Sequence, residues 1–398
     1  MGHACFWLTG KEGEGGQKGL MNRDRTPTMG SQPSLGLSLL ALLLLAGSAC
    51  GGAGEPGAEA PTTPQASPTE QPLPTEAEGR LAFIAGDGVT WDIYVLDVKG
   101  GEPTPLTEGL LGQWPRWSPD GQRLAFLSLP PEDGILSEKG ELVVVTADGA
   151  EQQTVAATGK TEIYSPALDW SPDGRRIAWE SGARSDEVPA GINAIDLETG
   201  EINELAPGHP GAMPAWSPDG SLIAFVSYKD EEDTDPDIYI MEADGSNVRR
   251  LADKDGHDIA PRWSPDGRHI VWWMRKTGGE AHDLFMAEVD KGKVEQLGSG
   301  SRPIWSPDGR RIAFMDLAEE NNVDIFVLDL DGDERVNVTN DAARDMWPTW
   351  SPDGTRIAFV SQRDNPQGEI YMVNADGSNL QRLTDNDLTE AMLAWSPG

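Results

Sequence analysis

The chain contains very little cysteine and comparatively few basic residues. Its 398 residues include only two cysteines, Cys5 and Cys50, and both precede any segment with the pattern of a folded domain. This excludes a framework of disulfide bonds and a zinc site built from cysteines. Lysine and arginine total 31 against 66 aspartates and glutamates, which gives a formal net charge of −35. Such a surface repels the phosphate backbone of DNA or RNA, so nucleic-acid binding is excluded as the function.

Long apolar runs are also lacking, apart from one near the beginning of the chain. Residues 35–46 read LGLSLLALLLLA, with two arginines before them and small residues after them, up to Cys50. This run is too short for a spanning helix, which needs about 20 residues, and its layout is that of an export signal. We therefore expect residues 1–49 to be a leader and signal peptide and the rest of the chain to be exported.

The residues around Cys50 resemble the processing site of bacterial lipoproteins. Small residues lead into this cysteine, and two glycines follow it. The resemblance implies that Cys50 is lipidated and anchors the chain to the bacterial membrane, facing the periplasm or the cell exterior. Gly47 stands where such sites usually carry Leu, Val or Ile, so cleavage by ordinary signal peptidase is the alternative. Met21 or Met29 is an alternative start, because the preceding polar sequence adds nothing that an export signal requires.

Large apolar residues are scarce in the segment that follows. Residues 50–79 contain no aromatic side chain, and Leu73 is their single large aliphatic residue, among glycine, alanine, proline, threonine and glutamate. Such a composition cannot bury a core, so we expect a flexible tether. Most of the negative charge therefore belongs to residues 80–398, the expected folded part.

A pentapeptide, Trp-Ser-Pro-Asp-Gly, recurs six times in this folded part, and a shortened copy ends the chain. The copies start at Trp117, Trp170, Trp216, Trp263, Trp305, Trp350 and Trp395. Their spacing of 42 to 53 residues is typical of one blade of a β-propeller. Ser, Pro, Asp and Gly are the residues that a tight turn between strands requires. We therefore interpret the motif as structural and not as a row of nucleophile and acid pairs.

Each repeat contains four short segments with a β-strand pattern, and the second of them gives the number of blades. These second strands start at Leu81, Leu124, Ile177, Ile223, Ile270, Ile312 and Ile357. The first has no motif before it, and the last motif has no strand after it. We therefore predict an all-β fold, a seven-bladed β-propeller of four-stranded blades over residues 80–398. Pairing of the C-terminal strand, residues 392–395, with the N-terminal blade would close the ring.

These repeats resemble the TolB-type propeller repeat, which occurs in periplasmic TolB and in the non-catalytic propellers of several peptidases. The resemblance covers residues 80–398. It implies a propeller that acts as a scaffold outside the cytoplasm and binds a protein or envelope partner. It does not imply a single activity, because propellers serve many functions.

The residues that an enzyme needs are sparse. No serine has glycine at both second-neighbour positions, as the nucleophile elbow of a peptidase requires. The histidines beyond the leader, His209, His257, His269 and His282, show no metal-binding spacing. We therefore predict a non-enzymatic protein without a cofactor or metal site. A propeller that senses a ligand or saccharide through its central channel is the alternative, and a hydrolase or lyase that uses channel-facing carboxylates is the third hypothesis.

Acidic residues concentrate in connections that we expect on one face of the ring. The turns from first to second and from third to fourth strands are short, whereas the other connections are long and acidic. The most acidic connection carries Asp230, Glu231, Glu232, Asp233, Asp235 and Asp237. We predict that these six residues bind a partner, which the charge suggests is basic.

Six of the seven third strands also open with an acid. These residues are Asp92, Glu141, Asp237, Asp283, Asp324 and Glu369. A ring of carboxylates would attract a basic partner or Ca²⁺, which prefers oxygen ligands. The alternative is solubility together with local hydrogen bonding where each strand begins. Residues 329–333 lack the spacing of an EF-hand, so the signal for calcium is weak.

Overall fold

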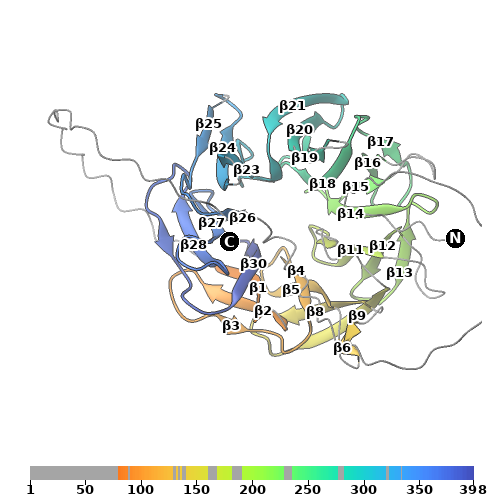
Figure 1. Cartoon of the computed structure of the whole chain (residues 1–398). Coiled ribbons are helices and arrows are strands. Elements are labelled where there is room, and N and C mark those ends of the chain that lie inside the picture. Colours follow the sequence, from red (N-terminus) through yellow and green to blue (C-terminus); the bar gives the residue numbers. More distant parts are fainter. Residues whose placement is uncertain are drawn as a thin grey trace, which may run out of the picture. The chain divides into compact units, whose positions relative to one another are not determined.

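The computed structural model describes residues 79–87, 90–128, 131–132, 135–136, 140–159, 168–181, 191–227, 235–276, 282–319, 322–332 and 334–398. Seven antiparallel sheets of four strands each surround a common axis (Figure 1). The predicted all-β, seven-bladed propeller is therefore confirmed. Within these ranges, no helix has the length and apolar character needed to cross a membrane.

The first three blades contain the following strands. Blade 1 comprises, from inner to outer strand, the C-terminal β30 (Thr389–Trp395), β1 (Arg80–Gly86), β2 (Trp91–Asp97) and β3 (Thr104–Pro105). Blade 2 comprises β4 (Gly112–Trp117), β5 (Arg123–Ser128), β8 (Gly140–Thr146) and β9 (Gln152–Gly159), with a short hairpin of β6 (Pro131–Glu132) and β7 (Ile135–Leu136) inserted. Blade 3 comprises β10 (Leu168–Trp170), β11 (Arg176–Ser181), β12 (Gly191–Asp196) and β13 (Ile202–Leu205).

The other four blades follow the same order from inner to outer strand. Blade 4 comprises β14 (Gly211–Trp216), β15 (Leu222–Ser227), β16 (Asp237–Glu242) and β17 (Arg249–Arg250). Blade 5 comprises β18 (His257–Trp263), β19 (His269–Arg275), β20 (His282–Glu288) and β21 (Lys293–Ser299). Blade 6 comprises β22 (Ser301–Trp305), β23 (Arg311–Glu319), β24 (Asn322–Asp329) and β25 (Glu334–Asn337). Blade 7 comprises β26 (Asp345–Trp350), β27 (Arg356–Ser361), β28 (Glu369–Asn374) and β29 (Gln381–Arg382).

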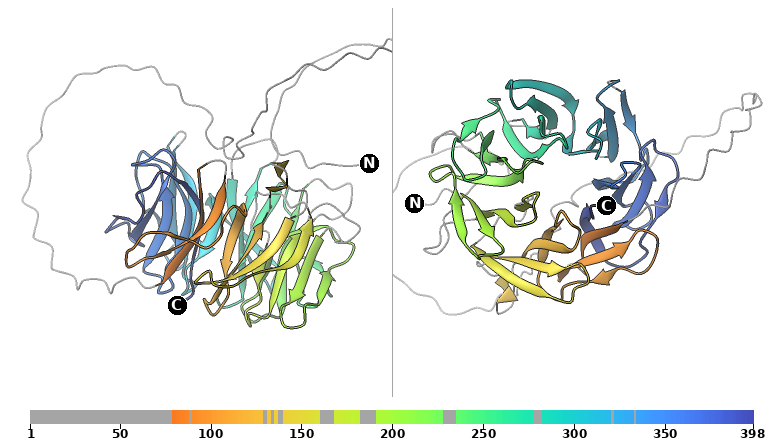
Figure 2. Two further views of the ribbon diagram at one scale, coloured as in Figure 1. Left: turned by 90° about the horizontal axis from the view of Figure 1, so that it is seen from below. Right: turned by 180° about the vertical axis from the view of Figure 1, so that it is seen from behind.

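The two ends of the described chain pair with each other. Strand β30 is antiparallel to β1, with Trp395 opposite Leu81 and Glu390 opposite Ala85. This confirms the predicted closure, although β30 begins at Thr389, three residues earlier than expected. The view from the side in Figure 2 shows the blades standing next to one another around the ring.

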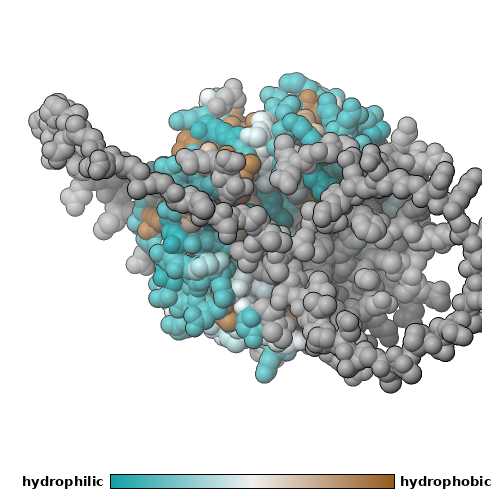
Figure 3. All heavy atoms as spheres, viewed as in Figure 1, coloured by the Kyte–Doolittle hydropathy of each residue, from teal (hydrophilic) through white to brown (hydrophobic). Residues whose placement is uncertain are grey.

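The core consists of the interfaces between blades. The second strand of every blade buries one aromatic ring at the same position, with at most 1% of the side chain exposed: Phe83, Phe126, Trp179, Phe225, Trp272, Phe314 and Phe359. An alanine precedes six of these rings, and Val271 precedes Trp272; the alanines let the neighbouring sheet approach closely. The surface is correspondingly polar (Figure 3), and the large apolar residues exposed in the described part are Ile202, Leu317 and Leu380.

The repeat motif joins each blade to the preceding one. The indole nitrogen of Trp117 donates a hydrogen bond to the carbonyl of Ala394 at 3.0 Å, and Trp263 donates to Ala215 at 3.0 Å. The motif serine donates to the motif aspartate at 2.5 to 2.6 Å in all six complete copies. The Ser118 hydroxyl thereby holds the pKa of Asp120 below its usual value. These bonds support the structural interpretation of the motif.

A bulge interrupts the inner strand of six blades, three residues before the motif tryptophan. The bulged residues have φ between +53° and +60°, in the left-handed region that non-glycine residues rarely adopt: Trp114, Met213, Ala260, Arg302, Trp347 and Met392. The pairing register shifts at each of them. A bulge changes the direction in which a side chain points, so the side chains at this position leave the strand in a direction that a regular strand would not allow.

Candidate functional site

The connections between strands fall into two groups by side. Turns from first to second and from third to fourth strands lie at one end of every blade, which we call the turn face. Connections from second to third strands and from a fourth strand to the next blade lie at the other end, which we call the loop face. Asp364 and Asp387 belong to two loop-face connections of blade 7, β27–β28 and β29–β30.

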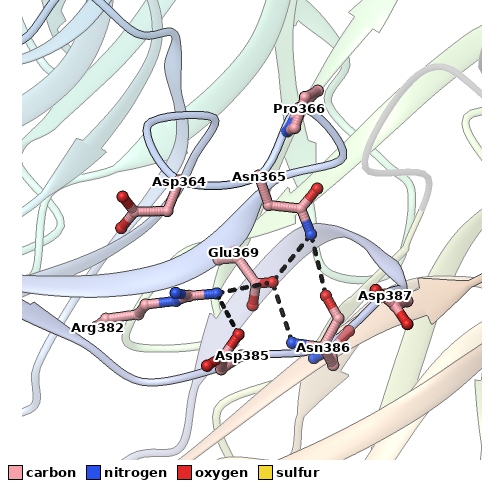
Figure 4. Close-up of a pocket in the computed structure, with 8 residues that line it drawn as sticks. All are labelled: Asp364, Asn365, Pro366, Glu369, Arg382, Asp385, Asn386 and Asp387. Atoms are coloured by element: carbon pink, nitrogen blue, oxygen red, sulfur yellow. Dashed lines mark hydrogen bonds and ion pairs between the residues drawn. The ribbon is translucent and has the colours of Figure 1, made fainter.

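These two connections form an open pocket of about 400 Å³. Its lining is almost wholly polar (Figure 4) and consists of Asp364, Asn365, Pro366, Glu369, Arg382, Asp385, Asn386 and Asp387. The pocket thus contains four carboxylates and one guanidinium group. Its excess of negative charge suits a cationic ligand or side chain.

Glu369 lies at the base of this pocket and is fully buried. Its Oε1 accepts hydrogen bonds from the side chain of Asn365 and the backbone of Asn386, both at 3.0 Å, and pairs with Arg382 at 3.2 Å. Arg382 in turn donates to Asp385 at 2.7 Å, as Figure 4 shows. Glu369 therefore orders the pocket and is not itself available to a partner.

The exposed carboxylates of the pocket are those of Asp364, Asp385 and Asp387. Asp385 keeps 88% of its side chain exposed although it pairs with Arg382. Exposed ion pairs contribute little stability, so the charge of Asp385 remains accessible to a binding partner. These three residues form the part of the pocket that can meet another molecule.

Blade 4 repeats this arrangement. Asp237 is fully buried and forms an ion pair with Arg250, which also donates to Asp253 at 2.7 Å. Asp253 is 77% exposed, and Asp255 in the same connection is exposed as well. Burial raises the pKa of Asp237 to about 6, against the lowering effect of Arg250. The sequences Arg-Leu-Ala-Asp and Arg-Leu-Thr-Asp mark the two copies of the arrangement, at 250–253 and 382–385.

A second buried acid from the next blade accompanies each of these ion pairs. Asp258 of blade 5 donates its backbone N–H to Pro236, and burial together with the charge of Asp237 raises its pKa to about 8. Glu390 of β30 accepts hydrogen bonds from Thr384 at 2.7 Å and Asn386 at 2.8 Å, and burial raises its pKa to about 7. The loop face therefore has buried acids beneath its exposed ones.

The acids that open the third strands are bound within their own blades. The partners are Thr107 for Asp92 at 2.8 Å, Thr154 for Glu141 at 3.0 Å, Arg250 for Asp237, Gln296 for Asp283 at 2.9 Å, Asn337 for Asp324 at 2.6 Å and Arg382 for Glu369. Each partner lies in or just beyond the fourth strand. This favours local hydrogen bonding over a ring of free carboxylates. No group of three or more potential metal ligands occurs in the part of the chain that the structure describes.

The structure places few of the residues predicted for partner binding. Residues 230–233 lie outside the described ranges, as does Cys50. Asp235 lies at the surface with 34% of its side chain exposed, and its carboxylate is 3.6 Å from His257. Asp237, by contrast, is buried and offers no surface to a partner. The alternation of side chains along a strand does not predict this difference, because residues two positions apart are expected on the same face.

The pocket in blade 7 was not among the sequence predictions. Its exposed acids, Asp364, Asp385 and Asp387, lie in two different connections. Asn365 and Asn386, which join these connections by a hydrogen bond, are 21 residues apart in sequence. Only the ring topology brings these connections together. The repeated Arg-Leu-Xaa-Asp sequence is the one feature of the sequence that could have indicated this pocket.

A family model described as "TolB beta propeller domain" matches residues 132–302 and 295–398. The uncharacterized protein Atu1656 of Agrobacterium fabrum is 29% identical over 190 residues, 45% of this chain and 60% of that protein. The uncharacterized peptidase YuxL of Bacillus subtilis is 32% identical over 131 residues, 32% of this chain and 19% of the peptidase. The Tol-Pal system protein TolB of Alcanivorax borkumensis is 31% identical over 104 residues, 26% of this chain and 24% of that protein. The chain spans less than two thirds of the length of each of these relatives.

Solved structures share the architecture. TolB from Acinetobacter baumannii superposes with a TM-score of 0.55 at 18% identity, over 82% of this chain and 68% of that chain. An oligogalacturonate lyase in complex with manganese gives a TM-score of 0.56 at 19% identity, over 74% of this chain and 86% of the lyase. At this level of identity, the similarity shows the fold alone.

Proposed function

Because the chain belongs to the TolB β-propeller family, we propose that it is a non-enzymatic scaffold that binds a basic partner through its loop face. The partner is a protein or another envelope component. The observation that carries this proposal is the open pocket of blade 7 on the loop face, which exposes the carboxylates of Asp364, Asp385 and Asp387. Asp253 and Asp255 of blade 4 are exposed on the same face. We include Asp230, Glu231, Glu232, Asp233 and Asp235 in the same surface on the strength of their sequence position.

Electrostatics favours this use of the loop face. A surface with one sign of charge steers an oppositely charged partner toward it and raises the association rate, most strongly at low ionic strength. The pocket of blade 7 adds a defined position for a lysine or arginine side chain, since Asn365 and Glu369 both hydrogen-bond Asn386 and so hold its two connections together. Binding would thus combine long-range attraction with a specific contact.

A peptidase function has less support. The similarity to the peptidase YuxL covers 19% of that protein, and no serine in this chain has the glycine neighbours of a nucleophile elbow. The pocket of blade 7 contains carboxylates but no histidine, serine or cysteine that could act as a nucleophile or as its base. Its chemistry is that of binding.

The proposed location is outside the cytoplasm, with Cys50 as a lipid anchor and residues 50–79 as the tether. Replacing Cys50 with serine should move the protein from the membrane fraction to the soluble fraction of the envelope. Metabolic labelling with a radioactive or alkyne fatty acid should mark the wild type and not the variant. Equal labelling, or an unchanged membrane fraction, would contradict lipidation at Cys50 and leave the loop-face proposal intact.

The partner proposal can be tested by capturing envelope proteins on the immobilised chain. A loop-face variant with Asp364→Asn, Asp385→Asn and Asp387→Asn should lose most of the captured partner, and added salt should weaken capture by the wild type. The matched control carries Glu151→Gln, Asp290→Asn and Asp331→Asn, three exposed acids in turn-face connections. It has the same net charge as the loop-face variant and should bind like the wild type. Equal losses in both variants would contradict a role specific to the loop face.

A further inference from the structure

The inner strands of the ring carry a cluster of three arginines and one aspartate, in which Arg116 and Arg262 act on Asp169, and Arg302 lies against Trp114 of the strand that carries Arg116. Arg116 on β4, Asp169 on β10 and Arg262 on β18 each directly precede a motif tryptophan, and Arg302 on β22 occupies a bulged position. Neighbouring inner strands contact one another around the axis (Figure 1). All four side chains are half-buried, which keeps part of each accessible to solvent.

These groups are near enough to influence one another. Burial, together with the charges of Arg116 and Arg302, lowers the pKa of Arg262 to about 9, against the raising effect of Asp169. Burial likewise lowers the pKa of Arg302 to about 10. Both values still leave the arginines protonated at neutral pH. Three cations and one anion thus give this cluster an excess of positive charge, inside a chain whose net charge is −35.

The single aspartate is already engaged by the fold. Asp169 accepts a hydrogen bond from the backbone N–H of Trp216 at 2.8 Å. The buried Nε of Arg116, in contrast, has no hydrogen-bond partner. A buried guanidinium nitrogen without an acceptor is costly, and one carboxylate cannot serve three arginines. The cluster therefore has donors to spare for an acceptor that comes from outside the chain.

Aromatic rings border the cluster on one side. The guanidinium of Arg302 lies 4.1 Å from the ring centre of Trp347 and 5.6 Å from that of Trp114, and the two indoles meet edge to face at 5.5 Å. All three residues occupy the bulged position. In other blades Met213, Ala260 and Met392 occupy the same position, so the bulge itself requires neither an arginine nor a tryptophan.

We infer that the inner strands hold an anion site in which Arg116, Arg262 and Arg302 bind a small ligand through carboxylate or phosphate oxygens. Guanidinium groups match these oxygens in a planar, paired geometry. Three arginines from three blades favour a ligand with two or more negative charges. The indoles of Trp114 and Trp347 would contact the uncharged part of that ligand. This site is separate from the loop face and binds a ligand of the opposite charge.

Calorimetric titration of the purified chain with citrate and, separately, with inorganic phosphate tests this inference. Calorimetry at low millimolar concentration is preferable to a melting shift, because both anions stabilise proteins non-specifically when concentrated. We expect saturable binding of at least one anion, weakened by sodium chloride. Binding of citrate alone identifies a carboxylate ligand, and binding of phosphate alone identifies a phosphate ligand.

Two variants locate the binding. Arg262→Gln should weaken binding by about tenfold or more, since a hydrogen bond to a charged group contributes roughly 1.5–3 kcal/mol. Arg268→Gln, which changes an exposed arginine on the turn face of the same blade, should bind like the wild type. Asp169→Asn removes the competing carboxylate but retains an oxygen for Trp216, so it should bind the anion more tightly. A merely structural role for Asp169 would not produce this gain.

Binding of neither anion would overturn the inference. Binding that is unchanged in both Arg262→Gln and Asp169→Asn would also overturn it, because the ligand would then lie elsewhere. If Arg262→Gln does not fold, the comparison of Asp169→Asn with the wild type still decides the matter.

Discussion

The serine hydroxyl of each complete repeat motif both donates and accepts a hydrogen bond, and these two bonds hold the turn together. In blade 7 the Ser351 hydroxyl donates to the Asp353 carboxylate at 2.6 Å and accepts from the backbone N–H of Arg356 at 2.9 Å. Both Ser351 and Arg356 are buried, so water cannot replace these bonds. The sequence predicts this structural use, because Ser, Pro, Asp and Gly suit a tight turn.

Replacing Ser351 with alanine should therefore destabilise the ring and leave binding unchanged. The expected cost is about 1–3 kcal/mol in the free energy of unfolding, because a buried backbone N–H loses its acceptor. Denaturant titration of the variant measures this cost. Gln381→Ala, an exposed change on β29 of the same blade, serves as the control and should stay within about 0.5 kcal/mol of the wild type. A similarly small effect of Ser351→Ala would contradict the structural role.

Single residues also show what a sequence pattern cannot predict, namely which acids of one segment are buried. Asp235 and Asp237 look equivalent in the sequence, yet one is at the surface and the other is buried against Arg250. The difference depends on where β16 begins and on the position of Arg250 in β17, thirteen residues further along. Patterns of charge reveal the acidic composition of a connection but not the direction of each side chain.

At the scale of strands and blades, buried acids link adjacent elements of the ring. Asp258 at the start of β18 lies beside Asp237 of β16, and Arg250 of β17 faces both. Burial raises the pKa of Asp258 from an ordinary value of 3.8 to about 8. The folded protein therefore binds a proton at Asp258 between these two pH values, and the unfolded chain does not.

Because the folded state holds more protons in this range, the free energy of unfolding should fall as pH rises toward 8. Asp237 and Glu390, with pKa values raised to about 6 and about 7, act in the same direction at lower pH. Asp258→Asn should flatten the decrease between pH 6 and pH 9 by at least about 1 kcal/mol. Denaturant titrations at several pH values measure this slope, with Asp255→Asn, an exposed change in the connection just before β18, as the control. An unchanged slope in Asp258→Asn would show that this carboxyl is not the group responsible.

The whole molecule follows from the repeat to a large extent. The number of blades and the closure of β30 on β1 could be predicted because the N-terminal blade lacks one strand and the C-terminus supplies it. The inner cluster of Arg116, Arg262 and Arg302 could not be predicted, because its members come from three different blades and Arg302 lies at a bulge that the sequence pattern does not reveal. The pocket of blade 7 likewise needs two connections that only the folded ring brings together.

The resulting molecule carries opposite charges in two places. Exposed carboxylates line the blade 7 pocket on the loop face, while Arg116, Arg262 and Arg302 lie on the inner strands. In the proposed function, the loop face meets a basic envelope partner. The anion site would let a small ligand bind the same ring without competing for that face.

Site-specific photo-crosslinking in the intact envelope tests the central claim most directly. A photoreactive amino acid replaces Asp387 on the loop face in one variant and Asp331 on the turn face in the other, both exposed positions. The proposed function predicts a discrete crosslinked partner from position 387 and none from position 331. Crosslinks of equal yield from both positions, or from position 331 alone, would contradict binding through the loop face.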